Sequence, residues 1–366
     1  MKEAERIDPW GSGDIKDYQN LFKEFGIESL EKYKKKYSDN RYMRRGIIFG
    51  HRDFGVISEA IEKKKPFVMM TGLMPSGRFH FGHKMVADQI VWYQNKGAEV
   101  FVCVADLEAC LMRGIDQKTA ITLAKEEYLT NYVALGLKPE KLHFYFQSNY
   151  VLPYYRFRDM HISNRVTLNE LKSIYGDLSS QKILSVLTQV ADILHPQLPE
   201  FGGPKPTIVP VGADQDPHMR LTRDIASRQR GLNLIPPSST CHKFMHGLRG
   251  GKMSSSDPKS HIALTDEPEI AEKKIKGSKT GGRATAREQK ERGGVPEDCM
   301  IYELFLYHLM DDDRDLEEIY RSCRSGERSC GECKKTCAET MTDFLKKHQK
   351  RRVNAEKIVE KILGRK

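Results

Sequence analysis

Short apolar runs and amphipathic stretches alternate through the middle of the chain, in the pattern of a parallel sheet with crossover helices. Residues 67–70 form an apolar run typical of a buried strand, and a turn at 75–77 leads into a predicted helix from about residue 83 to residue 95. A second apolar strand is predicted over residues 100–105. Strand, turn, helix and strand within about 40 residues are typical of a βαβ unit on a parallel sheet.

The same pattern returns much later in the chain. Residues 208–212 form another apolar strand, and a helix-like stretch follows over 217–230. Between the two patterns lie roughly a hundred residues of mixed helical character, with a strand-like segment at 142–146. We interpret them as an insertion that splits a nucleotide-binding fold, and we expect the functional site where the two halves meet.

Three regions follow from this pattern. Residues 1–65 are charged and helix-prone, and we predict an appended N-terminal region. Residues 66–266 are predicted to form a Rossmann-like catalytic domain with the insertion at about 110–205, and residues 267–366 carry apolar positions at helical spacing. The predicted fold class is therefore α/β, a Rossmann-like parallel-sheet domain with an insertion, followed by an α-helical C-terminal domain.

The distribution of charge along the chain indicates a binding partner. The chain has 366 residues and a net charge of +10, and its 39% hydrophobic content excludes a disordered protein. Residues 321–366 hold 14 Lys and Arg against 6 Asp and Glu, so most of the excess lies at the C-terminal end. We expect this end to bind nucleic acid. No apolar run has membrane-spanning length and the first residues lack an apolar core, so we expect a cytoplasmic protein with no membrane partner.

Two loops carry candidate chemistry. The first, Pro75-Ser76-Gly77-Arg78-Phe79-His80-Phe81-Gly82-His83, lies between a predicted strand and a predicted helix. Free backbone N–H groups at a helix start bind phosphate, and His80 and His83 can add donors. Gly82 would let a flat adenine approach the backbone. Taken alone, two histidines at a helix start are also typical of surface or capping residues.

The second loop, residues 250–258, is flanked by glycines and contains Lys252, Met253 and the serines Ser254 to Ser256. Such a loop can close over a triphosphate and bring the Lys252 ammonium beside the charge that develops on a leaving pyrophosphate. Taken alone, its composition is also that of a polar linker.

In this order, the two loops resemble the His-X-Gly-His and Lys-Met-Ser-Ser-Ser motifs of class I aminoacyl-tRNA synthetases. Nearly the whole chain from about residue 40 resembles the archaeal and eukaryotic tryptophanyl-tRNA synthetases, through residues 44–47, 51–53, 212–218, 220–224, 281–283, 311–313, 331–335 and 348–352. The resemblance implies activation of L-tryptophan with ATP and Mg²⁺, and transfer to tRNA(Trp). It also implies a homodimer and an anticodon-binding role for the C-terminal domain.

The resemblance assigns roles to single residues. The catalytic residues would be His80, His83, Lys252, Ser254 and Ser255. The ATP-binding residues would be Pro75, Ser76, Gly77, His80, Gly82, His83, Gly212, Asp214, Lys252, Met253 and Ser254. The amino acid would meet Met70, Gly72, Cys103, Glu108, Gln189 and Gln215, the last three as acceptors for its ammonium group. Met70 and Cys103 depart from the eukaryotic enzyme, which has a tyrosine and a glutamine on the indole N–H, and neither is a good acceptor.

Four cysteines form a candidate metal site. Cys299, Cys323, Cys330 and Cys333 follow the spacing C-x23-C-x6-C-x2-C, with Cys337 a helical turn beyond. Four thiolates suit Zn²⁺ or an iron–sulfur cluster. Some bacterial tryptophanyl-tRNA synthetases carry a 4Fe-4S cluster on nearly this spacing. We keep the cluster, Zn²⁺ and metal-free packing cysteines as alternatives.

Three functions stay open at this point. They are a tryptophanyl-tRNA synthetase, a tyrosyl-tRNA synthetase of the same architecture, and a non-catalytic tRNA-binding protein with this fold. The third is disfavoured because His80, Gly82, His83 and Lys252 are present together.

Overall fold

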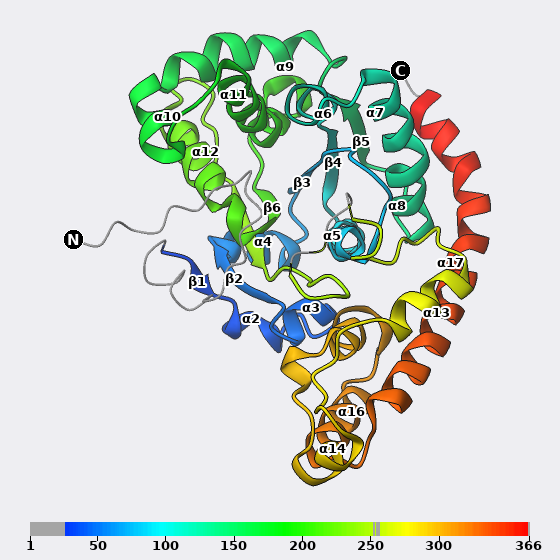
Figure 1. The fold of residues 1–366 in the computed structure, drawn as a ribbon. Helices are drawn as coiled ribbons and strands as arrows, with labels where there is room; N and C mark the ends of the chain where they lie inside the picture. The colour runs from blue at the N-terminus through cyan, green and yellow to red at the C-terminus, as the bar shows by residue number, and fades with distance from the viewer. Residues whose placement is uncertain (1–25, 252, 254–256, 365–366) are drawn as a thin grey trace.

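The sheet is the centre of the molecule. The structure is a computed structural model that describes residues 26–251, 253 and 257–364. Its seven-stranded sheet has the order β1-β2-β7-β6-β3-β4-β5 (Figure 1). The strands are β1 (Glu28–Ser29), β2 (Ile48–Arg52), β3 (Val68–Leu73), β4 (Glu99–Val104), β5 (Leu142–Phe146), β6 (Thr207–Gly212) and β7 (Ser238–His242).

Strands β5, β4, β3, β6 and β7 pair in parallel, whereas β1 and β2 are antiparallel additions beside β7. Numbered along the chain, the parallel strands lie in the order 3-2-1-4-5, which is that of a doubly wound sheet. The strand order reverses between β3 and β6. The predicted α/β fold with a Rossmann-like sheet is confirmed.

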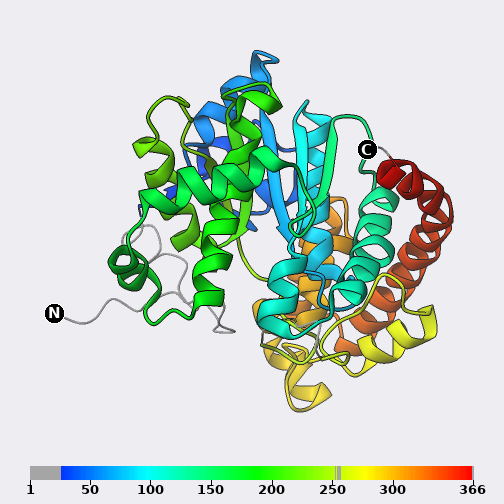
Figure 2. The same ribbon diagram turned by 90° about the horizontal axis from the view of Figure 1, so that it is seen from above.

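Both faces of the sheet are covered, which explains why its strands read as nearly continuous apolar runs. Because side chains alternate between faces, Met69 and Val100 pack in one apolar core and Met70 and Phe101 in the other. The first core includes helix α5 (Phe81–Asn95), and the second includes α11 (Ser180–Leu194) and α12 (Asp216–Arg228). Figure 2 shows green helices on one side of the sheet and teal and red helices on the other.

The predicted insertion supplies helices to both faces. Helix α8 packs through Val133 on the C-terminal helix, and α11 packs beneath β3. The short helices marked η are 3₁₀ or π turns. The segment contains α6 (Asp106–Arg113), α7 (Gln117–Leu123), η1 (Ala124–Leu129), α8 (Thr130–Ala134), α9 (Leu152–Arg156), η2 (Phe157–Ile162), η3 (Ser163–Arg165), α10 (Leu168–Tyr175), α11, η4 (His195–Gln197) and η5 (Pro199–Phe201).

The C-terminal region is helical, as the apolar spacing predicted. Its elements are α13 (Pro268–Lys276), α14 (Ala286–Arg292), η7 (Pro296–Asp298), α15 (Met300–Leu304), η8 (Phe305–Leu309), α16 (Asp313–Ser325) and α17 (Cys330–Gly364). Helix α17 runs from the lobe of α14 and α16 to the insertion (Figure 1). One apolar core continues from β3 to α17, so the boundary predicted at residue 267 crosses a shared core.

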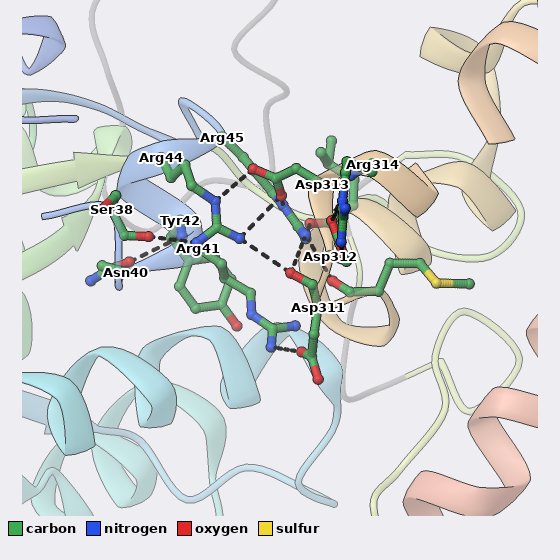
Figure 3. Close-up of polar contacts among 12 residues, drawn as sticks. Ser38, Asn40, Arg41, Tyr42, Arg44, Arg45, Asp311, Asp312, Asp313 and Arg314 are labelled. Atoms are coloured by element: carbon green, nitrogen blue, oxygen red, sulfur yellow. Dashed lines mark hydrogen bonds and ion pairs between the residues drawn. The ribbon is translucent and has the colours of Figure 1, made fainter. Parts of the chain in front are cut away.

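The described part of the N-terminal region, residues 26–65, is joined to both halves of the molecule. It contributes β1 and β2 to the sheet, with α2 (Glu31–Lys34), α3 (Arg41–Arg44) and α4 (Phe54–Glu62). Arg44 Nε and Arg45 Nε donate to the two carboxylate oxygens of Asp313 at 2.6 and 2.8 Å, and Arg41 pairs with Asp311 (Figure 3). Two segments about 269 residues apart in the sequence are therefore joined by these ion pairs.

Among the residues that the structure describes, no helix has both the length and the apolar character needed to cross a membrane.

Candidate active site

A cavity of about 500 Å³ opens at the carboxyl ends of the parallel strands, where their order reverses between β3 and β6. Doubly wound sheets bind their ligands at this point. Seven of the residues singled out in the sequence line it: Met70, Gly72, Cys103, Glu108, Gln189, Gly212 and Gln215. The fold therefore brings all six residues assigned to the amino acid into one cavity, from β3, β4, α6, α11 and the η6 turn (Ala213–Gln215) after β6.

Three candidate acceptors line this cavity. Gln189 on α11 and Gln215 on η6 are joined by a hydrogen bond of 3.3 Å from Gln189 Nε2 to Gln215 Oε1. Glu108 on α6 lines the same cavity. A carboxylate and two amide oxygens are the groups that a primary ammonium needs in a partly dry site.

The polar residues of the cavity wall that were missed in the sequence include Gln147 and Asp192. Asp192 Oδ1 accepts from the hydroxyls of Tyr145 and Tyr154, both at 2.8 Å, and Oδ2 accepts from Gln147 Nε2 at 2.7 Å. Burial raises the pKa of Asp192 to about 6, against the opposing effect of these hydrogen bonds. Asp192 follows Gln189 by three positions on α11, a spacing that puts both side chains on one helix face.

Met70 and Cys103 lie at neighbouring strand ends in the same cavity and are both buried. Burial raises the pKa of the Cys103 thiol well above its usual value, so it stays a neutral thiol. Neither side chain offers a strong acceptor, and the strong acceptor beside them is Asp192.

The turn before α5 is organised by its two histidines. His80 is the N-cap, and its Nδ1 accepts from the Gly82 N–H at 3.2 Å, while His83 Nδ1 accepts from the His80 N–H at 3.3 Å. Because a backbone N–H only donates, both Nδ1 atoms are unprotonated and each neutral ring carries its proton on Nε2. Burial lowers the pKa of His83 to about 3 and that of His80 further. Two neutral N–H donors therefore stand at a helix start, where anions bind.

At two glycines of the predicted nucleotide site, neighbouring side chains leave little room for a Cβ atom. A Cβ on Gly82 would lie 3.0 Å from the His80 ring. A Cβ on Gly212 would lie 2.8 Å from Asp214 Oδ1 and from the Phe244 ring. Met253 Sδ lies 3.5 Å from the same position on Gly82, so the second loop approaches the turn through this residue.

The remaining predicted nucleotide-binding residues lie apart from the cavity wall. They are Pro75, Ser76, Gly77, His80, Gly82, His83, Asp214 and Met253. Asp214 belongs to η6, directly after Gly212 and Ala213 at the cavity. Lys252, Ser254 and Ser255 lie outside the described residues.

The predicted metal site is not supported. Cys299 precedes α15, Cys323 lies in α16, and Cys330 and Cys333 lie at the start of α17. Over residues 26–251, 253 and 257–364, no group of three or more His, Cys, Asp or Glu side chains is arranged to hold a metal ion. Cys299 and Cys333 instead pack in the main apolar core, and burial raises the pKa of Cys333 to about 11. Burial, and after it the neighbouring Cys299 and Cys330 thiols, raises the pKa of Cys323, so these thiols lie near one another, but the described residues give no support for a 4Fe-4S cluster or Zn²⁺.

Comparisons with known proteins agree with this geometry. The family model "tRNA synthetases class I (W and Y)" matches residues 62–346. The chain is 52% identical over 356 residues to the tryptophan–tRNA ligase of Hyperthermus butylicus, with 95% of each chain covered. It is 47% identical over 365 residues to the ligase of that name in Methanocaldococcus jannaschii, with 98% of each chain covered.

Solved structures give the same result. The crystal structure of tryptophanyl-tRNA synthetase from Aeropyrum pernix K1 matches with a TM-score of 0.90 and 49% identity, over 97% of this chain and 98% of that one. The structure of a tryptophanyl-tRNA synthetase from Encephalitozoon cuniculi, bound to tryptophan, matches with a TM-score of 0.82 and 26% identity, over 95% and 98% of the two chains.

Proposed function

We infer that this chain, which belongs to the class I tRNA synthetases for tryptophan and tyrosine, is a tryptophan–tRNA ligase. The observation that carries this conclusion is the identity of up to 52% with tryptophan–tRNA ligases over nearly the whole chain. The tyrosyl and non-catalytic alternatives have no comparable support.

The reaction has two steps. The carboxylate of tryptophan attacks the α-phosphorus of ATP, a bond to the α-phosphorus forms and the bond to pyrophosphate breaks, which leaves tryptophanyl adenylate. The terminal ribose hydroxyl of tRNA(Trp) then attacks the adenylate carbonyl, and AMP leaves. Mg²⁺ bound with ATP supplies neutralisation of phosphate charge. Almost no side-chain proton transfer is needed, so the protein acts by positioning and by stabilising charge.

The cavity explains how tryptophan would be held. Glu108, Gln189 and Gln215 would accept from its ammonium group, and Met70 would pack on the indole through its polarizable sulfur. We propose Asp192 as the acceptor for the indole N–H. Its Oδ1 accepts from Tyr145 and Tyr154 and its Oδ2 from Gln147, and the Cys103 thiol, a weak donor, also hydrogen-bonds to this carboxylate, so the indole N–H would take the place of that thiol. This fills the role that neither Met70 nor Cys103 can take.

The residues beside the cavity would hold ATP. His80 and His83 present N–H donors for phosphate oxygens at the start of α5. Gly82 would lie beneath the adenine, and Gly212 and Asp214 would meet the ribose. Lys252, Ser254 and Ser255 would act from the second loop, with Lys252 on the leaving pyrophosphate.

Pyrophosphate exchange tests this function. We expect labelled pyrophosphate to exchange into ATP when tryptophan is added and not when tyrosine is added. Exchange that depends on tyrosine would identify a tyrosyl enzyme. Absence of exchange with either amino acid, in protein that binds tRNA, would identify a non-catalytic tRNA-binding protein.

The C-terminal region, residues 267–366, would be the anticodon-binding domain. Lys346, Lys347 and Lys350 are exposed on α17 and form a basic face. We expect their joint replacement by alanine to weaken tRNA binding while pyrophosphate exchange stays near the parent rate. The slope of log Kd against log salt should become shallower by up to about one unit for each phosphate that the variant no longer neutralises. An unchanged slope would mean that this face carries only solvated charge.

We also propose a homodimer that works in the cytoplasm. Large apolar side chains are exposed on one stretch of the insertion, at Val151, Leu152, Met160, Leu168 and Leu184, the most exposed being Met160 at 64%. Exposed apolar residues concentrated on one segment are typical of a protein interface. A second copy of the chain is the partner that the resemblance implies.

A further inference from the structure

The segment that follows the second loop is hydrogen-bonded to the turn before α5, which contains Phe79 and His80 and is called the phosphate-binding turn below. The Leu264 N–H donates to the Phe79 carbonyl at 2.9 Å, and His80 and Ala263 form an antiparallel bridge. The ring of His261 lies 4.8 Å from the ring of His80. Residues 261–264 therefore lie directly against the residues that begin α5.

Asp266 is the anchor of this contact. Its side chain is 1% exposed, and its Oδ1 accepts from Arg78 Nη1 at 2.6 Å. Its Oδ2 accepts from the Ala263 N–H at 3.0 Å and from Lys274 Nζ at 2.7 Å. Arg78 also donates from Nη2 to Thr265 Oγ1 at 2.7 Å. One buried carboxylate thus joins the turn before α5, the end of the loop segment and helix α13.

Burial alone would favour the neutral carboxyl, yet Lys274, the Ala263 N–H and Arg78 together lower the pKa of Asp266 below its usual value. The carboxylate is therefore charged at neutral pH, and its hydrogen bonds are charge-assisted. Removing the charge while keeping the shape would weaken the contacts with Arg78 and Lys274 together.

Helix α17 reaches the same anchor. Gln349 Nε2 donates to the backbone carbonyl of Asp266 at 2.9 Å. Gln349 lies between Lys347 and Lys350, whose side chains are exposed on the basic face of α17. A tRNA bound to Lys350 would therefore contact the residue next to Gln349, which is hydrogen-bonded to Asp266.

The neighbouring residue of α17 reaches the other side of the turn. His348 Nε2 lies 2.7 Å from Asn131 Oδ1, and Asn131 Nδ2 donates to the Glu127 carbonyl. Glu127 Oε2 in turn accepts from the Phe79 N–H at 3.1 Å. Consecutive residues of α17 thus hold both flanks of the phosphate-binding turn.

We propose that Asp266 is a positioning residue for adenylate formation, because it holds the turn before α5 in place, and that the hydrogen bond from Gln349 connects this arrangement to helix α17. The proposal rests on the proposed function, because it concerns the step that makes the adenylate. Through its contacts with Arg78 and the Ala263 N–H, Asp266 fixes residues 261–264 against the turn that carries His80.

Asp266→Asn tests the positioning role, because it removes the charge and keeps the shape. We expect the kcat of tryptophan-dependent pyrophosphate exchange to fall about tenfold or more, since a small displacement of a reacting group is costly. The KM for tryptophan should stay unchanged, because Asp266 lies outside the tryptophan cavity. If Asp266 had only a structural role, the substitution would reduce the amount of active protein, and the remaining active protein would keep the parent kcat and KM.

Glu272→Gln is the matched control. It removes a carboxylate from the exposed ion pair with Lys276 on the same helix as Lys274, away from the anchor. Its exchange rate should equal that of the parent. If Asp266→Asn also keeps the parent kcat, the positioning role is overturned. If the parent itself shows no exchange with tryptophan, it is the proposed function that fails.

Gln349→Ala tests the link to α17 and stays available if Asp266→Asn does not fold. We expect it to lower kcat by about threefold, in the range found for residues that couple two sites. The double variant should be no slower than Asp266→Asn alone, because both changes displace the same residue, one through its side chain and the other through its backbone carbonyl. A parent-like kcat for Gln349→Ala, or independent effects that multiply in the double variant, would overturn the link.

Discussion

Replacing Lys252 with alanine should slow adenylate formation by about 10² to 10³-fold and leave tryptophan binding nearly unchanged, the result expected for the loss of one preorganised electrostatic donor. This corresponds to about 3 to 4 kcal/mol of barrier. The ammonium meets charge that develops on pyrophosphate as the bond breaks, so it acts mainly in the transition state. Single-turnover formation of the adenylate, with tryptophan binding measured separately, distinguishes the two effects.

Lys259→Ala is the control for this experiment. Lys259 is an exposed lysine of the segment after the loop, so the change removes an equal charge close to the same site. It should form adenylate at the parent rate. Equal rates for Lys252→Ala and the parent would remove Lys252 from the mechanism.

Asp192→Asn should lower kcat/KM for tryptophan by roughly tenfold to 150-fold, because a hydrogen bond to a charged group contributes about 1.5 to 3 kcal/mol. A tryptophan analogue with sulfur in place of the indole N–H isolates the contact. The parent should prefer tryptophan over this analogue, and Asp192→Asn should lose most of that preference. Asp224→Asn, which changes an exposed carboxylate paired with Arg228 on α12, should keep it.

The pH dependence of kcat/KM for tryptophan also tests the role of Asp192. The pKa of Asp192 is raised to about 6, so the carboxylate that accepts from the indole N–H is present above this pH and is lost below it. We expect kcat/KM for tryptophan to fall as the pH falls through about 6. His83, with its pKa lowered to about 3, and His80, lower still, do not titrate in this range. A step near pH 6 that persists in Asp192→Asn would assign the titration to another group.

The strands and the helix start at the first loop were readable in the sequence because their signals are local. The apolar runs at 67–70, 100–105 and 208–212 correspond to β3, β4 and β6, and the motif from Pro75 to His83 does lie at the start of a helix. Hydrophobic periodicity and motif spacing need no distant partner to be recognised. The structure brings Glu108, Gln189 and Gln215, which the resemblance assigned to the ammonium group, into one cavity.

The cysteine spacing shows the opposite case. Four thiols at a spacing typical of a metal site lie on elements whose packing is not encoded in that spacing, and the described residues give no support for a bound metal. Helix packing places Cys299 and Cys333 in the apolar core instead.

What the sequence by itself determined is therefore the α/β fold with its Rossmann-like parallel sheet and the place of the motif from Pro75 to His83 at a helix start. Only the tertiary structure decided which distant groups meet. Asp192 became an acceptor because β5 and α9 bring Tyr145 and Tyr154 to it, and Asp266 became an anchor because α17 and the turn before α5 converge there. The reason is physical: a local pattern reports which face of an element is buried, whereas a hydrogen bond across the fold depends on the packing of several elements at once.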